Sequence, residues 1–170
     1  MHMNLIFAVD GNWKIGYNGQ MLVEIEEDLH RFRRITEGHI VIMGRKTMEA
    51  LPKQQPLENR INIIVTRNKE FTKEGFIIVN SIEDLFPLLK EINPEKEMEV
   101  FVTGGGTIAR QLLLFCNKAY ITKIFRDFRN TDTFIPNLDL DPDWHVVEES
   151  EVFRQEDIYY RYVDYERIRW

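Results

Sequence analysis

The sequence predicts one α/β domain with a mostly parallel central sheet of about eight strands, flanked by about four helices. Three observations lead to this fold. Short apolar runs alternate with helical patterns along the chain. The early runs are rich in Ile and Val and apolar at consecutive positions, which is typical of strands buried on both faces. Strand–helix–strand alternation implies right-handed crossovers, so helices should cover both faces of the sheet.

The strands follow from these apolar runs. The expected ranges are 5–9, 40–43, 61–66, 76–79, 100–103, 119–125, 145–150 and 159–167. The last two follow each other without a helix between them, so we expect a C-terminal antiparallel hairpin at the edge of the sheet.

The helices follow from apolar residues at 3.6-residue spacing. We expect helices at 25–36, just after Arg45, at 82–92 and at 107–115. Residues 12–24 separate the first strand from the first helix and are expected to form a long irregular loop. Loops of that length inside a domain are usually functional. Gly16 and Gly19 would let this one move or turn sharply.

Composition and charge exclude some classes of protein. The chain has 170 residues, of which 44% are hydrophobic, so it can bury one core without cross-links. We therefore interpret residues 1–170 as a single domain. A formal net charge of −6 does not suit a nucleic-acid-binding protein. The basic group Arg31, Arg33 and Arg34 lies among acids and is interpreted as a solvated helix face.

Cysteine, histidine and serine do not form the usual reactive patterns. Cys116 is the single cysteine, so no disulfide can form within the chain, and we expect a reducing, cytoplasmic compartment. The four histidines lack metal-ligand spacing, so no metal site is predicted. Ser81 and Ser150 lie outside any G-x-S-x-G turn, which argues against a serine hydrolase.

The sequence shows no targeting or membrane segment. No apolar run reaches the roughly 18 residues of a membrane span, and no charged-then-apolar leader is present. The opening Met1-His2-Met3 is interpreted as an expression remnant with Met3 as the natural start, and it is left out of the fold prediction. Since nothing in the sequence indicates an exposed apolar patch, we expect a monomer.

Asp28 interrupts the apolar face of the first predicted helix. At helical spacing it shares that face with Ile25, Leu29, Phe32 and Thr36. A partly buried carboxylate should have a raised pKa and would be a candidate acid/base group or an anchor for a cationic heterocycle. The alternative is an acid that simply favours the helix N-terminus, as the two preceding glutamates do.

Two glycine segments end buried strands. In the segment 40–47 a strand runs into Gly44 and then Arg45, where free backbone N–H groups and a cation could bind an anion. In the segment 102–109 three consecutive glycines, Gly104, Gly105 and Gly106, end a strand and open a helix. We interpret the two segments as two sides of one diphosphate site. The alternative is two unrelated tight turns.

A third strand end carries polar groups. Thr66 and Arg67 follow the strand predicted at 61–66, and Asn68 and Lys69 come next. A hydroxyl and cations at the carboxyl end of a strand suit a phosphate monoester, because ligands of open α/β sheets gather at that edge. The alternative is an ordinary polar turn.

Taken together and in order, these motifs resemble those of dihydrofolate reductases, over essentially the whole chain from Leu5 onward. The similarity lies in Ile6-Phe-Ala8 with Ile15-Gly16, in the helix motif 27–32, in the cofactor segments 41–47 and 102–107, in residues 56–60, in Thr122 and in the distal loop 131–134. No single motif decides the family. Their joint order and spacing are specific to it.

The resemblance implies a site for each part of the reaction. Asp28 grips the pterin and Thr122 hydrogen-bonds that acid, so these two are the catalytic candidates. The implied substrate-binding residues are Ile6, Ala8, Asp28, Phe32, Leu51, Leu57, Arg60 and Thr122, with Arg60 pairing with the glutamate tail. The implied NADPH-binding residues are Ala8, Ile15, Gly16, Gly44, Arg45, Lys46, Thr47, Thr66, Arg67, Thr103, Gly104, Gly105, Gly106 and Thr107.

The resemblance also implies the chemistry. Hydride passes from NADPH to C6 of dihydrofolate, and a proton reaches N5 from water, while Asp28 orients the ring and favours its protonated form. It further implies a cis peptide between Gly104 and Gly105 and binding of antifolate inhibitors. The distal loop at 131–134 is expected to pack on the mobile loop.

The chain departs from the family in the mobile loop. Val23 stands where the family usually has tryptophan, and Glu26 where proline is common. Val23 cannot supply an indole N–H or a large flat surface, so loop closure and turnover rate should be affected. Two rival interpretations remain. A pterin or flavin-precursor reductase, as in riboflavin biosynthesis, generally lacks a carboxylate like Asp28, and a non-catalytic nucleotide-binding module would have lost turnover.

Overall fold

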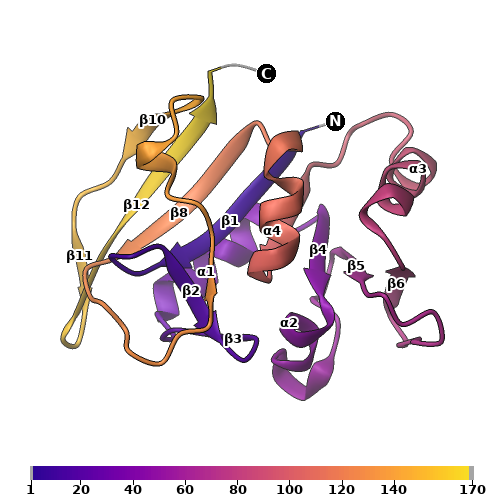
Figure 1. The fold of residues 1–170 in the computed structure, drawn as a ribbon, viewed down its shortest axis with the longest axis horizontal. Helices are drawn as coiled ribbons and strands as arrows, with labels where there is room; N and C mark the ends of the chain where they lie inside the picture. Colours follow the sequence, from indigo (N-terminus) through magenta and orange to yellow (C-terminus); the bar gives the residue numbers. More distant parts are fainter. Residues whose placement is uncertain (1, 169–170) are drawn as a thin grey trace.

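The computed structural model describes residues 2–168, and its main sheet has the strand order β10-β12-β8-β1-β7-β4-β5-β6 (Figure 1). From β8 to β6 in this order, neighbouring strands are parallel. Strand β12 is antiparallel to both of its neighbours, β8 and β10. The mixed α/β fold with a mostly parallel sheet is therefore confirmed. Within the described residues, no helix is both long and apolar enough to cross a membrane.

Each predicted strand is present, with ends that differ by one or two residues. The main-sheet strands are β1 (Met3–Val9), β4 (Ile40–Gly44), β5 (Ile61–Val65), β6 (Phe76–Val79), β7 (Val100–Gly104), β8 (Lys118–Ile124), β10 (Trp144–Glu149), β11 (Phe153–Gln155) and β12 (Ile158–Arg167). The predicted C-terminal hairpin gains one element, because β11 lies between its two long strands and pairs with β12.

The fold prediction left out Met3, but the structure places it in the sheet. This residue begins β1, is buried and pairs with Val100, and the carbonyl of His2 accepts a hydrogen bond from the Val100 N–H at 2.9 Å. Met1 lies outside the described residues.

The helices lie on both faces of the sheet, as predicted (Figure 1). One face packs against α3 (Ile82–Ile92) and α4 (Gly106–Leu112), which is followed by a 3-10 turn, Leu113–Phe115. The other face packs against α1 (Glu26–Thr36), α2 (Arg45–Glu49) and a 3-10 turn, Pro52–Gln54. Neighbouring residues of a strand point to opposite faces, so Leu5 and Ile6 belong to different core clusters.

The expectation of an irregular loop at 12–24 is corrected by the structure. This segment contains β2 (Lys14–Tyr17) and β3 (Gln20–Met21), which form a hairpin, and β2 also pairs with β9 (Thr133–Phe134). The pairing of β2 with β9 confirms that the distal loop packs on this segment. The strands were missed because they are short and show no clear alternation of apolar and polar residues.

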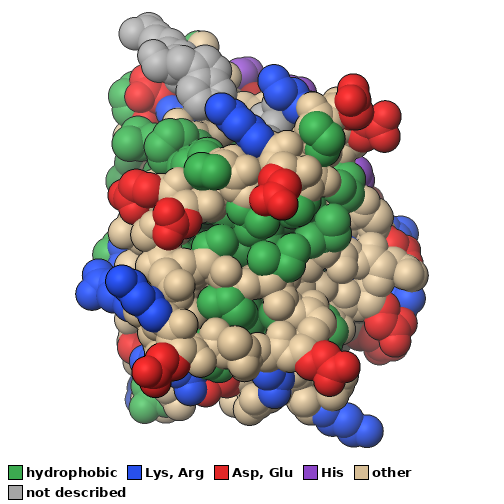
Figure 2. Space-filling view, turned by 90° about the vertical axis from the view of Figure 1, so that its right-hand side faces the viewer, with side chains coloured by type: hydrophobic (Ala, Val, Ile, Leu, Met, Phe, Trp, Pro, Cys, Tyr) green, Lys and Arg blue, Asp and Glu red, His purple; other side chains and the backbone are tan. Residues whose placement is uncertain are grey.

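Apolar side chains gather on the face of the molecule that Figure 2 shows, on the side of α3 and β6. Leu114 and Phe115 after α4 are 72% and 46% exposed, and Phe115 packs on Phe86 of α3 with ring centroids 4.7 Å apart. The sequence interpretation that no apolar patch is exposed is therefore wrong, because helical spacing alone did not show which side of α4 and its 3-10 turn the sheet leaves uncovered.

Candidate active site

A cleft of about 1030 Å³ runs along the carboxyl ends of β1, β4 and β7, between α1 on one side and the glycine segments on the other. Ligands of open α/β sheets bind at this edge. The cleft brings together most of the predicted positions: Ile6, Ala8, Ile15, Gly16, Asp28, Phe32, Gly44, Arg45, Lys46, Thr47, Leu51, Leu57, Arg60, Thr103, Gly104, Gly105, Gly106, Thr107 and Thr122. Thr66 and Arg67 do not line it.

Asp28 is the carboxylate in the middle of the cleft. The Thr122 hydroxyl, on β8, donates a hydrogen bond to its Oδ1 at 2.6 Å, across 94 residues of sequence. Burial raises the pKa of Asp28, while the Thr122 hydrogen bond and the positive charge of Arg31 act in the opposite direction. A half-buried carboxylate with one oxygen fixed by a hydroxyl leaves its other oxygen available to a ligand in the cleft.

The N-terminus of α1, which carries Asp28, is held by a side chain from β11. The helix has no capping side chain of its own at Ile25. Instead, the amide of Gln155 accepts a hydrogen bond from the Glu26 N–H at 2.8 Å and donates one to the Glu24 carbonyl at 2.9 Å. This clamp satisfies one of the free N–H groups of the helix and fixes the chain just before Asp28.

Replacing Gln155 by Ala should lower the unfolding free energy by about 1 kcal/mol, since two partly solvated hydrogen bonds are lost. It should also lower kcat/KM a few-fold, because Asp28 is two residues beyond the clamped Glu26. Thermal melts and steady-state rates measure the two effects. Gln155→Glu is the matched control, because it keeps the acceptor for Glu26 and should have an intermediate effect. An Ala variant with an unchanged melting temperature would contradict the clamp.

The interpretation of Arg31 as part of a solvated helix face is wrong. Its side chain is 18% exposed and lines the cleft, and it pairs with Asp164 of β12 at 3.2 Å. The exposed side chains of Arg33 and Arg34 do match that interpretation. The signal that could have separated them is spacing, because Arg31 lies three residues after Asp28 and shares its face. Glu24, Leu29 and other lining residues were also missed.

Arg60 lies where α1 and residues 57–60 meet. Its Nη1 donates to the Thr36 hydroxyl at 3.1 Å and its Nε to the Glu58 carbonyl at 2.9 Å. The guanidinium also lies over the Phe32 ring at 6.0 Å. Burial and the nearby Arg33 lower its pKa, but an arginine stays charged in proteins. These contacts fix the guanidinium at the cleft with donors to spare for a carboxylate.

The glycine segments form the other wall of the cleft. The peptide bond between Gly104 and Gly105 is cis, as the family resemblance implied. Gly104 has φ of +148°, and a Cβ there would lie 2.7 Å from the Thr47 hydroxyl. A Cβ at Gly106 would lie 2.5 Å from the carbonyl of Phe134. Only glycine therefore lets these backbones approach each other and a ligand so closely.

Arg45 opens α2 directly after Gly44. Its guanidinium lies 4.6 Å from the Phe71 ring centroid and pairs with Glu49 at 3.6 Å. Gly44 pairs with Val65, so β5 ends beside it and Thr66 and Arg67 extend the row of strand ends beyond the cleft. Arg67 is exposed. Arg45 therefore lines the cleft, whereas Thr66 and Arg67 lie outside it.

The hairpin of β2 and β3 covers the cleft between its two ends. Asp10 is buried and accepts hydrogen bonds from Asn12, Lys14 and Phe128, which ties this hairpin to the segment after β8. The Asp132 carboxylate accepts from the Asn18 N–H. The segment therefore has defined anchors at its start and at its tip.

Val23 does not replace the family tryptophan at the cleft. It packs in an apolar cluster with Ile124 and Ile158, and the cleft is instead lined by its neighbour Glu24. Trp13 offers no substitute, because it is 5% exposed and packs edge-on against Tyr165 in the core.

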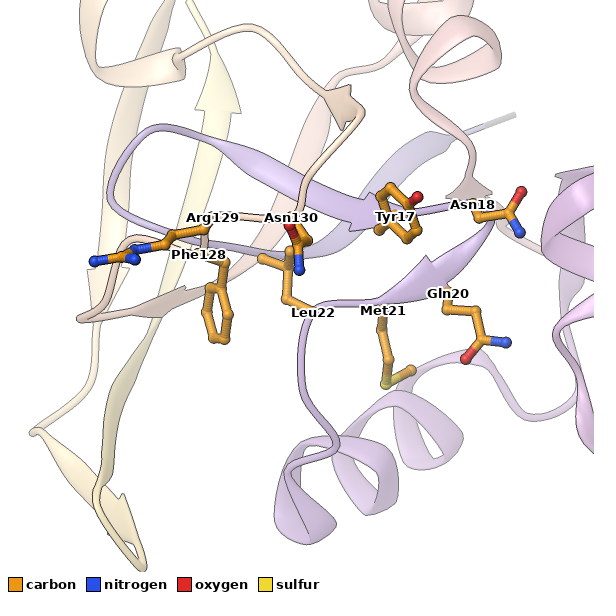
Figure 3. Close-up of a pocket in the computed structure, with 8 residues that line it drawn as sticks. All are labelled: Tyr17, Asn18, Gln20, Met21, Leu22, Phe128, Arg129 and Asn130. Carbon is orange, nitrogen blue, oxygen red and sulfur yellow. The ribbon is translucent and has the colours of Figure 1, made fainter.

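A second hollow of about 520 Å³ lies beside β3 and the segment after β8. Figure 3 shows Phe128 and Met21 pointing to the same side of this hollow, while Arg129 points away from them. Gln20 and Met21 line both hollows. The strand β3 therefore borders both hollows.

A parallel sheet with a long cleft at its carboxyl edge, one half-buried carboxylate and glycine-rich strand ends defines a nucleotide-dependent α/β enzyme. The family model described as dihydrofolate reductase matches residues 2–167. Named dihydrofolate reductases from Bacillus subtilis and Staphylococcus haemolyticus are 34% and 36% identical to this chain. The matches cover 94% and 99% of it and 90% and 98% of the relatives.

A solved structure agrees with these relatives. The dihydrofolate reductase from Enterococcus faecalis, complexed with NADP(H) and RAB-propyl, superposes with a TM-score of 0.83 at 25% identity. The superposition covers 98% of this chain and 96% of that one. The chain belongs to the dihydrofolate reductase family.

Proposed function

We infer that this chain reduces 7,8-dihydrofolate to 5,6,7,8-tetrahydrofolate with hydride from NADPH. The observation that carries this conclusion is the half-buried Asp28, fixed by Thr122 at 2.6 Å, in the same cleft as the glycine segments of β4 and β7. Family membership and the likeness to a dihydrofolate reductase complexed with NADP(H) support it.

The residues present fit NADPH. The backbones at Gly104 and Gly106 leave no room for a Cβ. Both residues line the cleft, where a diphosphate could accept hydrogen bonds from backbone N–H groups. Lys46 and Arg45 add positive charge at the neighbouring strand end. When bound, NADPH supplies a hydride from its nicotinamide ring to C6 of the pterin.

The protein contributes orientation and electrostatics. Asp28 would accept hydrogen bonds from the 2-amino group and N3 of the pterin, with Thr122 holding the carboxylate in position. Phe32 and Leu51 would pack against the ligand, and Arg60 would bind the glutamate carboxylate at the cleft mouth. Holding the pterin beside a negative carboxylate favours its protonated form, so that N5 can take a proton from water.

A single assay tests the function against its rivals. NADPH absorbance is followed with dihydrofolate, with a flavin-precursor substrate and without substrate. We expect consumption with dihydrofolate alone. Consumption of NADPH with the flavin precursor would support the rival reductase. Asp28 would then have no pterin to bind. NADPH binding without any turnover would support the non-catalytic module.

The choice between NADPH and NADH should depend on Arg67. We propose that Thr66, Arg67 and Arg45 surround the 2′-phosphate, since they extend the row of strand ends past the cleft. Replacing Arg67 by Gln should weaken NADPH binding by about tenfold and leave NADH nearly unchanged, because a charge-assisted hydrogen bond to phosphate is lost. Titration by fluorescence measures both affinities. Lys90→Gln is the matched control, because Lys90 is exposed on α3 and does not line the cleft. Equal losses for both cofactors would remove Arg67 from this role.

The remaining parts of the proposal concern the oligomeric state, the cellular compartment and the inhibitors. We propose that the chain acts as a monomer in a reducing cytoplasmic compartment, where the buried Cys116 stays a thiol. Folate analogues that inhibit this family should bind in the same cleft, in contact with Asp28. Sedimentation at micromolar concentration tests whether the chain is a monomer. If it sediments as a dimer, the exposed side chains of Leu114 and Phe115 are where we expect the two copies to meet.

A further inference from the structure

A buried ion pair lies beside the carboxylate of Asp28. Arg31 is one helical turn after it on α1, and its Nη2 donates to Oδ1 of Asp164 on β12 at 3.2 Å. The two side chains are only 18% and 12% exposed. Removing two charges from water is costly, and the attraction between them does not always repay that cost. An ion pair in this position is therefore a weak source of stability, and the charge of Arg31 acts on Asp28.

Aromatic rings hold the guanidinium of Arg31 in place. It lies 4.2 Å from the ring centroid of Tyr162 and 5.9 Å from that of Tyr120. Such cation–π contacts strengthen when the cation is desolvated. The Tyr162 hydroxyl is itself buried. Arg31 is thus fixed by contacts on two strands, with its charge directed along the wall of the cleft.

The groups that interact with Asp28 come from α1, β8 and β12: they are Arg31, Thr122, Tyr160 and Tyr162. Glu24, from the loop before α1, lines the same cleft. Asp164 is in turn influenced by Arg31, by Lys118 of β8 and by Glu148 of β10. Among them, Arg31 is the cation on the same helix face as Asp28, whereas Lys118 lies over Tyr120 and beside Asp164.

We propose that Arg31 and Asp164 form a positioning pair that sets the charge of Asp28: Arg31 favours the ionised carboxylate, and Asp164 limits how strongly it does so. This rests on the proposed function of the cleft, because Asp28 acts there through its charge. Two variants should therefore have opposite effects. Loss of Arg31 makes it harder for Asp28 to ionise, and loss of the Asp164 charge makes it easier.

The balance of forces agrees with this assignment. Burial raises the pKa of Asp28, and the positive charge of Arg31 lowers it. Burial also raises the pKa of Asp164, and Arg31 again acts against that. An opposite charge within about 4–6 Å typically lowers a carboxyl pKa by about 1–3 units. Asp164 partly neutralises Arg31, so Arg31 lowers the pKa of Asp28 less than an unpaired arginine would.

The test compares Arg31→Met with Asp164→Asn in two measurements. The first is the pH profile of kcat/KM with dihydrofolate and NADPH. The second is the titration of the Asp28 carboxyl carbon by ¹³C NMR in the ligand-free protein. In both, Arg31→Met should move the midpoint of Asp28 ionisation to higher pH, and Asp164→Asn should move it to lower pH. A merely structural pair would lower the melting temperature and the rate and leave both midpoints unchanged.

Two further variants keep the test decisive. Arg31→Lys retains the charge and should leave the midpoint near that of the wild type. The double variant Arg31→Met/Asp164→Leu removes both charges, and its midpoint should lie above that of Asp164→Asn. It also removes the unpaired buried charge, so it should fold even where Arg31→Met does not.

The outcomes separate this inference from the proposed function. Shifts in the same direction for both single variants, or no shift in the NMR titration, would overturn the pair's role whatever the turnover. If the wild-type protein binds no dihydrofolate but the two single variants shift the NMR midpoint in opposite directions, the proposed function is overturned and the role of the pair stands.

Discussion

Asp28→Asn should lower kcat/KM by at least 100-fold near neutral pH. Asn keeps the shape of the side chain and can still accept from the Thr122 hydroxyl, which lies 2.6 Å from Oδ1 in the structure. It cannot carry the negative charge that favours a protonated pterin. Acid–base assistance is typically worth about 10²–10⁴-fold. The deficit should shrink as the pH falls, because the solvent then protonates the substrate before it binds.

Stability separates this catalytic effect from misfolding. Burial raises the pKa of Asp28 in the folded state, so the folded protein binds a proton more readily than the unfolded chain. Ionised Asp28 therefore costs stability, and this cost appears as the pH rises from the unfolded pKa through the raised folded one. At neutral pH the Asn variant should be at least as stable as the wild type, and below both pKa values the difference should vanish.

The measurements are kcat/KM against pH for both proteins, with thermal melts at each pH. A variant within a few-fold of the wild type at neutral pH would remove Asp28 from the chemistry. A variant equally impaired at every pH would show that Asp28 orients the pterin without affecting its protonation. Thr122→Val is the matched control, because it leaves the charge and removes the hydroxyl, and its loss should be smaller.

Periodicity was enough to predict the sheet and the side of α1 that faces the cleft. Apolar positions at 3.6-residue spacing put Asp28 and Phe32 on one face, and both line the cleft. The buried strands were equally legible, because their apolar runs are continuous and end at glycines such as Gly44. These are local signals, and a single sequence carries them.

Partners that come from distant parts of the chain could not be predicted in this way. Arg31 looked like one member of a solvated basic group because its partner Asp164 is 133 residues away. The Gln155 clamp on Glu26 spans 129 residues. Both partners lie on the C-terminal strands β11 and β12. No local sequence pattern specifies how these strands are positioned against β8 and against the residues before α1.

Arg60→Ala should weaken dihydrofolate binding by about 10–100-fold. The proposed partner is the glutamate α-carboxylate of the substrate, and hydrogen bonds between charged groups contribute about 1.5–3 kcal/mol. The guanidinium is already positioned by the Thr36 hydroxyl at 3.1 Å and the Glu58 carbonyl at 2.9 Å. Little conformational entropy is therefore lost when the substrate binds, so most of that interaction should appear as affinity.

A pterin fragment that lacks the glutamate provides the discriminating measurement. It cannot reach Arg60, so its KM should change less than twofold in Arg60→Ala, while the KM of dihydrofolate rises. Arg60→Lys should recover part of the loss, since it keeps the charge but not the planar pair of donors. Arg34→Ala is the matched control, because Arg34 is exposed, pairs with Glu27 at 3.1 Å and does not line the cleft. If the fragment is weakened as much as dihydrofolate, Arg60 supports the end of α1 through Thr36 and does not bind the substrate tail.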